Sequence, residues 1–418
     1  MRRLVLPIMI LAVVLLAIPL CCFRKVAAVP AFSRRFGVSC AACHTTPPRL
    51  NETGYRFRAA GFRWPEAIGS KDSSEKFDIR NYMSARIQVS YSAKRTETGP
   101  TKTSTSNGPR LQALELYPFI GSWGKHFSGD TKVTFGPTGA PAIENAYVKG
   151  TAGNAKRFIG ARVGIYHPFD GYGASDSPAT ISRPFFQATP ANRDGSTFFT
   201  TWGFDQLGAE IGLDYRRTSV RAALLKGLVL KEEDGKFKAS AFPGRPLSSG
   251  SATPSSHTPD LQLLVNQVLT PEGGGVSLVY YHGNLTLPVA GTGKFFINRF
   301  DRVAVYGSYP LAKHLYVLGG FQHGRDHLAT GKTFASEGAF IEAEVPVNQI
   351  SAAGVRYDWF DPSRDKAKNE VNGITAYVNA WFYKQFRIVA EYQHKNTLRG
   401  LASKQRDDAF QIRFIYFK

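Results

Sequence analysis

The sequence predicts an all-β transmembrane barrel of about 16 antiparallel strands, preceded by a small N-terminal module. Three observations predict this fold class. From about residue 77, apolar and polar residues alternate, the alternating segments are about ten residues long, and long connections alternate with short ones. A tilted strand needs ~9–11 residues to cross the hydrocarbon core of a membrane. The barrel is therefore expected over residues 77–418.

The chain begins with the pattern of an export signal. A basic head, a continuous apolar run that ends at Phe23 and small residues that end at Ala28 predict a secretory signal over residues 1–28. The apolar run is close to the length of a membrane span, so an uncleaved anchor stays open. Cleavage would leave Cys40 and Cys43 as the only cysteines of the mature chain.

Period-two alternation gives each predicted strand one apolar and one polar face. Leu207, Ile211 and Leu213 lie on one face, for example, and Glu210 and Asp214 on the other. The predicted strand cores are 82–92, 111–122, 127–135, 142–150, 157–166, 205–215, 218–230, 260–269, 275–284, 298–309, 314–323, 335–346, 351–360, 371–383, 386–395 and 407–417.

The lengths of the connections indicate where the barrel lies. Tight turns such as Arg216-Arg217 are interleaved with long connections, and the first (94–110) and the last (396–406) are both long. Outer-membrane barrels have short periplasmic turns, long external loops and an even number of strands. The pattern therefore predicts the bacterial outer membrane, with both ends of the chain in the periplasm.

The chain is strongly basic, with a formal net charge of +20 at pH 7. Such a charge is compatible with nucleic acid, but an exported chain meets the phosphate groups of lipid instead. Outer-membrane lipid and lipopolysaccharide are therefore the expected partners, and no nucleic acid is expected.

Cys40-Ala41-Ala42-Cys43-His44 is the motif that carries chemistry. A redox dithiol normally lies in a βαβ context, which the surrounding sequence does not offer. The motif is instead typical of a c-type haem site, in which Cys40 and Cys43 bind the vinyl groups and His44 is the proximal iron ligand. One covalent haem c is predicted, and a redox dithiol or a structural metal site are the alternatives. No catalytic residue beyond the haem is predicted.

The sixth ligand of the iron is left unknown by the sequence. Met83 shares a face with apolar residues of the first strand and is expected to face lipid. Water or an open position is an alternative to a side chain. The remaining histidines carry no distinguishing signal: His126, His167, His257, His282, His314, His323, His327 and His394.

Residues 29–76 are expected to form the haem module. A chain this short rarely folds without a staple, and a barrel of this size has room in its lumen. The module is therefore predicted to lie in the mouth of the barrel as a plug or cap. A cytochrome head hanging in the periplasm is the alternative.

Residues 30–65 resemble the N-terminus of the outer-membrane monohaem c-type cytochrome–porin fusions of iron-oxidising bacteria. The resemblance implies an oxidoreductase of the Fe(II)–cytochrome c reductase type, which oxidises extracellular Fe(II) and passes electrons to a periplasmic c-type cytochrome or copper protein. The matching positions are Pro30, Phe32, Gly37, Cys40, Cys43, His44, Pro48, Leu50, Gly54, Phe57, Gly61 and Phe62.

Several alternatives to this function stay open. The predicted outer loops are basic and would repel hydrated Fe²⁺, which leaves room for another extracellular electron donor. The chain could also be a porin whose cytochrome module acts as a plug, a haem-binding sensor, or a conduit that exports electrons. The oligomeric state has no signal in the sequence.

Overall fold

The computed structural model describes residues 30–69, 78–99, 102–136, 141–168, 171, 179–189, 191–193, 196–198, 205–227, 229–233, 236–240, 258–289, 294–348, 350–382, 385–399 and 403–418. The predicted signal over residues 1–28 lies outside them. Among the described residues, no helix is both long enough and apolar enough to span a membrane.

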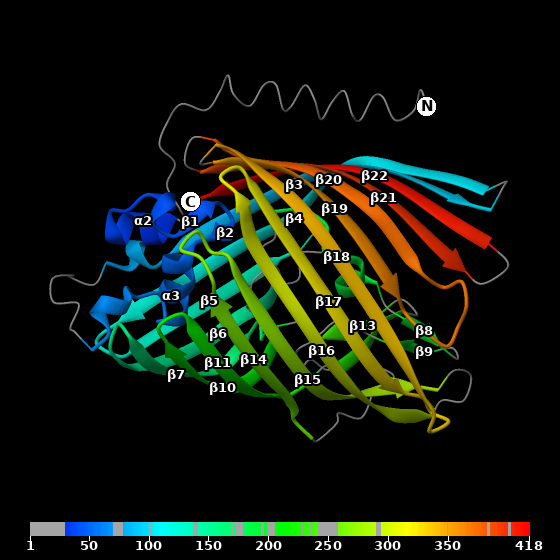
Figure 1. Ribbon diagram of the computed structural model, residues 1–418, viewed down its shortest axis with the longest axis horizontal. Coiled ribbons are helices and arrows are strands. Elements are labelled where there is room, and N and C mark those ends of the chain that lie inside the picture. The colour runs from blue at the N-terminus through cyan, green and yellow to red at the C-terminus, as the bar shows by residue number, and fades with distance from the viewer. Residues whose placement is uncertain are drawn as a thin grey trace.

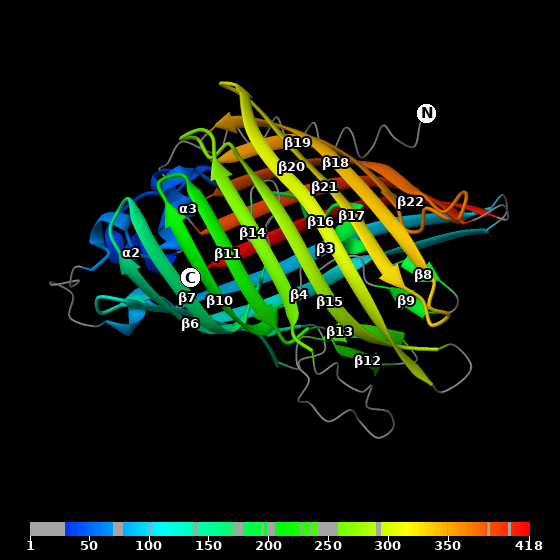
Figure 2. The same ribbon diagram turned by 60° about the horizontal axis from the view of Figure 1, so that its bottom comes forward.

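A closed antiparallel barrel of sixteen strands dominates the structure, and the first strand pairs with the last (Figures 1 and 2). The predicted strand number is confirmed. In chain order the strands are β3 (Ser84–Thr98), β4 (Lys102–Trp123), β5 (Phe127–Phe135), β6 (Pro141–Gly153), β7 (Arg157–Tyr166), β10 (Gln206–Tyr215), β11 (Thr218–Leu225), β14 (Asp260–Val268), β15 (Gly275–Pro288), β16 (Phe295–Ala312), β17 (Leu315–His327), β18 (Thr333–Asn348), β19 (Ser351–Asp361), β20 (Val371–Phe382), β21 (Phe386–Arg399) and β22 (Ser403–Phe417).

The alternation of the strands is confirmed, and its apolar face points outward. In β10, Leu207 and Ile211 are exposed on the outer surface, whereas Glu210 and Asp214 are buried in the lumen. Ile211 is 59% exposed and Glu210 only 7%. A barrel with an apolar exterior and a polar interior is suited to lipid outside and to charged groups inside.

Two of the predicted long connections are wrong. Residues 94–110 and 396–406 form paired strand over most of their length, because β3 and β4 continue to Thr98 and from Lys102, and β21 and β22 continue to Arg399 and from Ser403. These stretches are rich in Thr, Ser and charged residues. These stretches lack alternating apolar residues, so the sequence pattern does not mark them as strand. The hydrogen-bonded pairing nevertheless continues through them.

The N-terminal unit, residues 30–69, occupies one mouth of the barrel. Its elements are α2 (Pro30–Phe36), the 3₁₀ turns η1 (Cys40–Ala42) and η2 (Pro65–Ala67), the short strands β1 (His44–Thr46) and β2 (Arg49–Leu50), and α3 (Glu52–Ala59). A third turn, η3 (Ile79–Asn81), leads into β3. The tight turns and the C-terminus lie at this same end (Figure 1). Short turns mark the periplasmic end of such barrels.

Shorter elements occur in the long connections between barrel strands β7 and β10 and between β11 and β14. They are α4 (Phe185–Ala188), the hairpin of β8 (Ala191–Arg193) and β9 (Ser196–Phe198), and the hairpin of β12 (Val229–Glu233) and β13 (Lys236–Ser240). Phe185, Phe186 and Phe198 are almost fully buried against inward-facing aromatic residues of the wall, such as Phe334 and Phe340. An apolar cluster therefore fills part of the lumen on the side away from the N-terminal unit.

Candidate functional site

The Cys-x-x-Cys-His segment is shaped by its own backbone and by the helix that follows it. Cys40–Ala42 form a 3₁₀ turn in which the N–H of Cys43 donates to the carbonyl of Cys40 at 3.1 Å. Asn51 caps α3 by accepting from the N–H of Gly54 at 2.9 Å, and its amide donates to the carbonyl of Ala42 at 3.3 Å. One side chain thus ties the turn to the helix.

Gly54 allows close contact between α3 and the motif. A Cβ atom built on Gly54 would lie 2.1 Å from the carbonyl oxygen of Cys43 and 2.9 Å from Leu50. Only glycine fits this approach without a shift of the backbone. The helix therefore packs directly on the residue that precedes His44.

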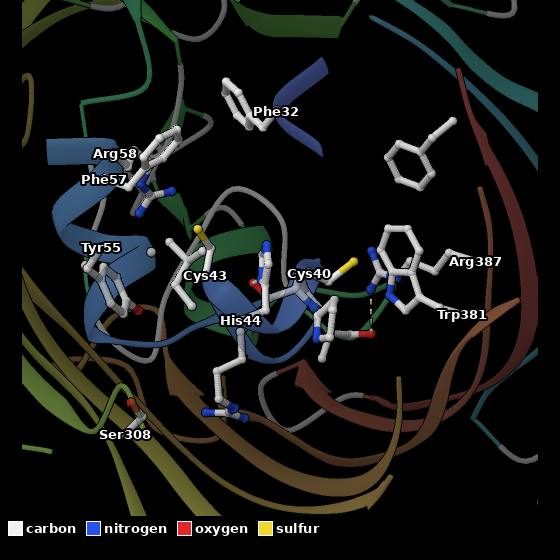
Figure 3. Close-up of a pocket in the computed structure, with 18 of the residues that line it drawn as sticks. Phe32, Cys40, Cys43, His44, Tyr55, Phe57, Arg58, Ser308, Trp381 and Arg387 are labelled. Carbon is white, nitrogen blue, oxygen red and sulfur yellow. Dashed lines mark hydrogen bonds between the residues drawn. The ribbon is translucent and has the colours of Figure 1, made fainter. Parts of the chain in front are cut away.

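The two thiols and the imidazole point into one open space (Figure 3). Cys40 and Cys43 form no disulfide, and Cys40 is 5% exposed. Nδ1 of His44 is hydrogen-bonded to the carbonyl of Pro48 at 3.2 Å, which makes Nδ1 the protonated nitrogen and leaves Nε2 a lone pair. Burial raises the pKa of Cys40 to about 12 and that of Cys43 to about 11, and it lowers the pKa of His44 to about 4.

The space is a cavity of about 370 Å³ between the N-terminal unit and the barrel wall. This volume is within the ~300–1,000 Å³ of small-molecule and cofactor sites. Much of its lining is apolar and aromatic, and Phe32, Phe57 and Phe62 pack together with ring centroids 5.2–6.3 Å apart. The aromatic and proline side chains of the lining are Phe32, Phe36, Pro47, Pro48, Tyr55, Phe57, Phe62, Trp64, Tyr117, Pro184, Phe340, Trp381 and Phe417.

The last strands of the barrel close the cavity beside Cys40. Trp381 of β20 stacks on Phe417 of β22 with centroids 5.0 Å apart, and both belong to the apolar cluster that includes Cys40. Nε1 of Trp381 is buried without a hydrogen-bond partner among the described residues. These residues were not singled out from the sequence. Aromatic residues at inward positions near the tight-turn end would have been a signal for them.

Polar contacts hold the unit in the mouth. Arg49 forms an ion pair with Glu344 of β18 at 2.7 Å, and the two side chains are 9% and 2% exposed. Asn379 of β20 donates to the carbonyl of Pro47 at 2.8 Å, and Arg63 donates to the carbonyl of Gly124 at 2.8 Å. The contacts come from widely separated strands, so the unit lies within the mouth and not below it.

This donor set is chemically suited to a covalently attached haem. Two reduced thiols lie three positions apart, and an imidazole nitrogen with a free lone pair follows them. The lining of the space they face is largely apolar but includes charged side chains such as Arg58, Arg183 and Arg387. The buried indole N–H of Trp381 would gain a partner from a polar atom of a bound group.

Comparison with known proteins identifies the barrel. No protein-family model and no curated protein sequence matches the chain. Among solved structures, the outer membrane channel DcaP of Acinetobacter baumannii superposes with a TM-score of 0.51 at 13% identity, covering 80% of this chain and 96% of that chain. An anion-selective porin from Comamonas acidovorans gives 0.52 at 11% identity, with 79% and 98% covered. OmpT of Vibrio cholerae gives 0.50 at 11%, with 83% and 100% covered.

This chain has the porin fold. The predicted bacterial outer-membrane location is confirmed by that fold and by the apolar outer surface of the barrel. At 11–13% identity the likeness shows the fold alone, and it does not reach the chemistry of the N-terminal unit.

The structure brings the three predicted site residues of this porin-fold chain together, and the other described histidines lie outside the cavity. Of the described histidines, only His44 lines the cavity. His282 and His394 bind carboxylates across neighbouring strands, namely Asp301 at 2.9 Å and Asp408 at 2.8 Å. Met83 is 45% exposed and does not line the cavity, and His257 lies outside the described residues.

Proposed function

We propose that this outer-membrane barrel carries one covalent haem c in its cavity and transfers single electrons across the outer membrane. The observation that supports this most directly is the convergence of Cys40, Cys43 and His44 on one largely apolar cavity between the N-terminal unit and the barrel wall. When bound, the haem supplies a one-electron couple between ferrous and ferric iron, which axial ligation and burial tune.

Each residue of the motif has a role in this proposal. Cys40 and Cys43 would hold the haem through thioether bonds formed by addition of the thiols to its vinyl groups, and His44 would offer Nε2 to the iron. The carbonyl of Pro48 keeps the proton on Nδ1 and fixes the plane of the ring. Phe57 and its aromatic neighbours keep water away from the site. The sixth position is not assigned to a side chain.

The proposed donor is extracellular Fe(II), which loses one electron and becomes Fe(III). The proposed acceptor is a periplasmic c-type cytochrome or copper protein. The resemblance of residues 30–65 to the cytochrome–porin fusions supports both. In the described part of the chain, no group of three or more His, Cys, Asp or Glu residues is placed to hold a metal ion. The donor would therefore react without a dedicated iron site among those residues.

A second candidate is a porin whose N-terminal unit acts as a plug, and the likeness to channels favours it. The filled lumen argues against it, because a porin needs an open path for solutes. The N-terminal unit occupies one end, and the cluster around Phe185, Phe186 and Phe198 occupies part of the other. A liposome-swelling assay separates the two candidates: a porin passes small solutes, whereas the proposed conduit passes almost none.

The test starts with protein secreted by a host that attaches c-type haem. We expect a Soret band that survives denaturation, and a haem that becomes reduced when Fe(II) is added without oxygen. Cys40→Ser/Cys43→Ser should lose the denaturation-resistant band. His282→Ala, a histidine outside the cavity, serves as the matched control and should keep it. Protein without covalent haem would overturn the proposal, and a haem that stays oxidised would remove Fe(II) as donor.

A further inference from the structure

A second, smaller hollow at the periplasmic end is rich in arginine. It is formed by α3, by the adjoining ends of β10 and β11 with their turn, and by the end of β14. Five arginines and one carboxylate line it: Arg56, Arg58, Arg216, Arg217, Arg221 and Asp214. Arg221 and Asp214 are buried. Lys156 is exposed in the adjacent turn, where its carbonyl accepts from the N–H of Arg216 at 2.8 Å. We call Arg56, Arg58, Arg216, Arg217 and Lys156 the arginine surface.

Two carboxylates, Asp214 and Glu52, accompany the five arginines and Lys156. Glu52 pairs with Arg217 at 2.9 Å, and both side chains are partly exposed. The guanidinium of Arg216 lies over the ring of Tyr215, 5.3 Å from its centroid. The ring is uncharged, so this contact does not neutralise the charge of Arg216. Clustered like charges at a solvent-facing surface raise the local potential and speed the approach of a partner of opposite charge.

The arginine surface and the cavity meet at one helix, α3. Tyr55 and Arg58 line both the cavity and the arginine-rich hollow, and both belong to α3. Figure 3 shows them on the helix beside Cys43. Gly54 of the same helix packs against the carbonyl of Cys43. A helix with its side chains is ~10–12 Å across, so a partner on this surface would lie about one helix diameter from the cavity.

From this geometry we infer that the arginine surface is the docking site of a small acidic periplasmic electron carrier. The inference rests on the proposed function, because it explains how the electron leaves the site. A carrier with carboxylates around its redox centre matches the surface in charge. Docking there places its centre on the far side of α3 from Cys43 and His44.

Charge reversal at exposed positions tests the inference. Arg216→Glu/Lys156→Glu alters two solvent-exposed residues and leaves the Glu52–Arg217 pair and the cavity lining unchanged. The matched control is Lys404→Glu/Arg406→Glu, which reverses two exposed residues at the other end of the barrel. The probes are two fluorescently labelled c-type cytochromes of similar size, one acidic and one basic, added to the protein in nanodiscs at several salt concentrations.

We expect the acidic cytochrome to bind with an association rate that falls as salt rises, and the basic one to bind at least about tenfold more slowly. The reversal variant should lose at least about tenfold in rate for the acidic probe, and the control should keep its rate. Equal binding of both probes, or equal loss in the control, would overturn the inference. Binding to anionic lipid vesicles without binding of either cytochrome would assign the surface to lipid and overturn it as well.

Because the label is on the probe, binding is measured whether or not the chain holds haem. Haem loading is read separately from the Soret band. Salt-dependent docking on a chain that lacks haem would refute the proposed function and retain the arginine surface. A haem-loaded chain without such docking would refute the surface and retain the proposed function.

Discussion

The ion pair between Arg49 and Glu344 offers a sharp test of how the N-terminal unit is held. Arg49→Met keeps most of the side-chain length and removes the charge. It leaves the Glu344 carboxylate, 2% exposed, with the hydroxyl of Tyr377 at 2.8 Å and with electrostatic attraction to Arg387. Removal of one partner from a buried pair costs about 3–5 kcal/mol. The population of the undocked unit should rise by a factor of about 10²–10⁴.

The assay uses protein made without haem attachment, so that both thiols are free to react. Alkylation of the buried Cys40 reports opening of the unit, and heat-modifiable migration on a gel reports the intact barrel. Arg217→Met is the matched control. Its pair with Glu52 is at the same end, but the two side chains are 45% and 21% exposed, so the loss should be ~1 kcal/mol or less.

A double variant separates the lost attraction from the penalty of a lone buried charge. Arg49→Met/Glu344→Gln should label more slowly than Arg49→Met alone, because the amide carries no charge that needs a partner. If Arg49→Met labels at the rate of the parent protein, or if Arg217→Met has the same effect, the buried pair does not hold the unit in the mouth.

Three further variants test other contacts. Gly54→Val would bring a Cβ to 2.1 Å from the Cys43 carbonyl, so we expect a large loss of covalent haem on an otherwise intact barrel, measured by Soret absorbance per barrel; full loading would contradict the close packing. Phe57→Ala should destabilise the unit by about 3–5 kcal/mol, seen as faster thiol alkylation, and an unchanged rate would argue against the aromatic core. Glu391→Gln weakens the acceptor of the Ser182 N–H at 3.1 Å, which should cost about 1–3 kcal/mol and speed proteolysis within residues 179–189; resistance equal to the parent would contradict this.

The barrel was predictable because a membrane imposes a strict rule on each strand. Ile211 faces lipid and is apolar, whereas its neighbour Glu210 faces the lumen and is polar. The rule fails beyond the membrane. The polar hairpin tips around Lys94 and Lys404 are paired strand, but they lack alternating apolar residues. Only their backbone hydrogen bonds define them as strand, and these cannot be seen in the polarity of the sequence.

The site was predictable only where its residues are neighbours in the sequence. Cys40, Cys43 and His44 form a motif because attachment chemistry needs that spacing. Trp381 and Phe417, which close the cavity beside Cys40, lie more than three hundred residues further along. Their proximity results from the closure of the sheet, which joins β22 to β3, and from the seating of the unit in the mouth.

The position of the N-terminal unit in the mouth limits when it can dock during assembly of the barrel. Its anchors include Gly124, Glu344 and Asn379, which are distributed over most of the barrel sequence. The anchors on β18 and β20 are in position only once those late strands have joined the sheet. The segment with the two thiols therefore cannot take its final place in the mouth before those strands are present. Any enzyme that modifies those thiols has its access during this interval, before insertion encloses them.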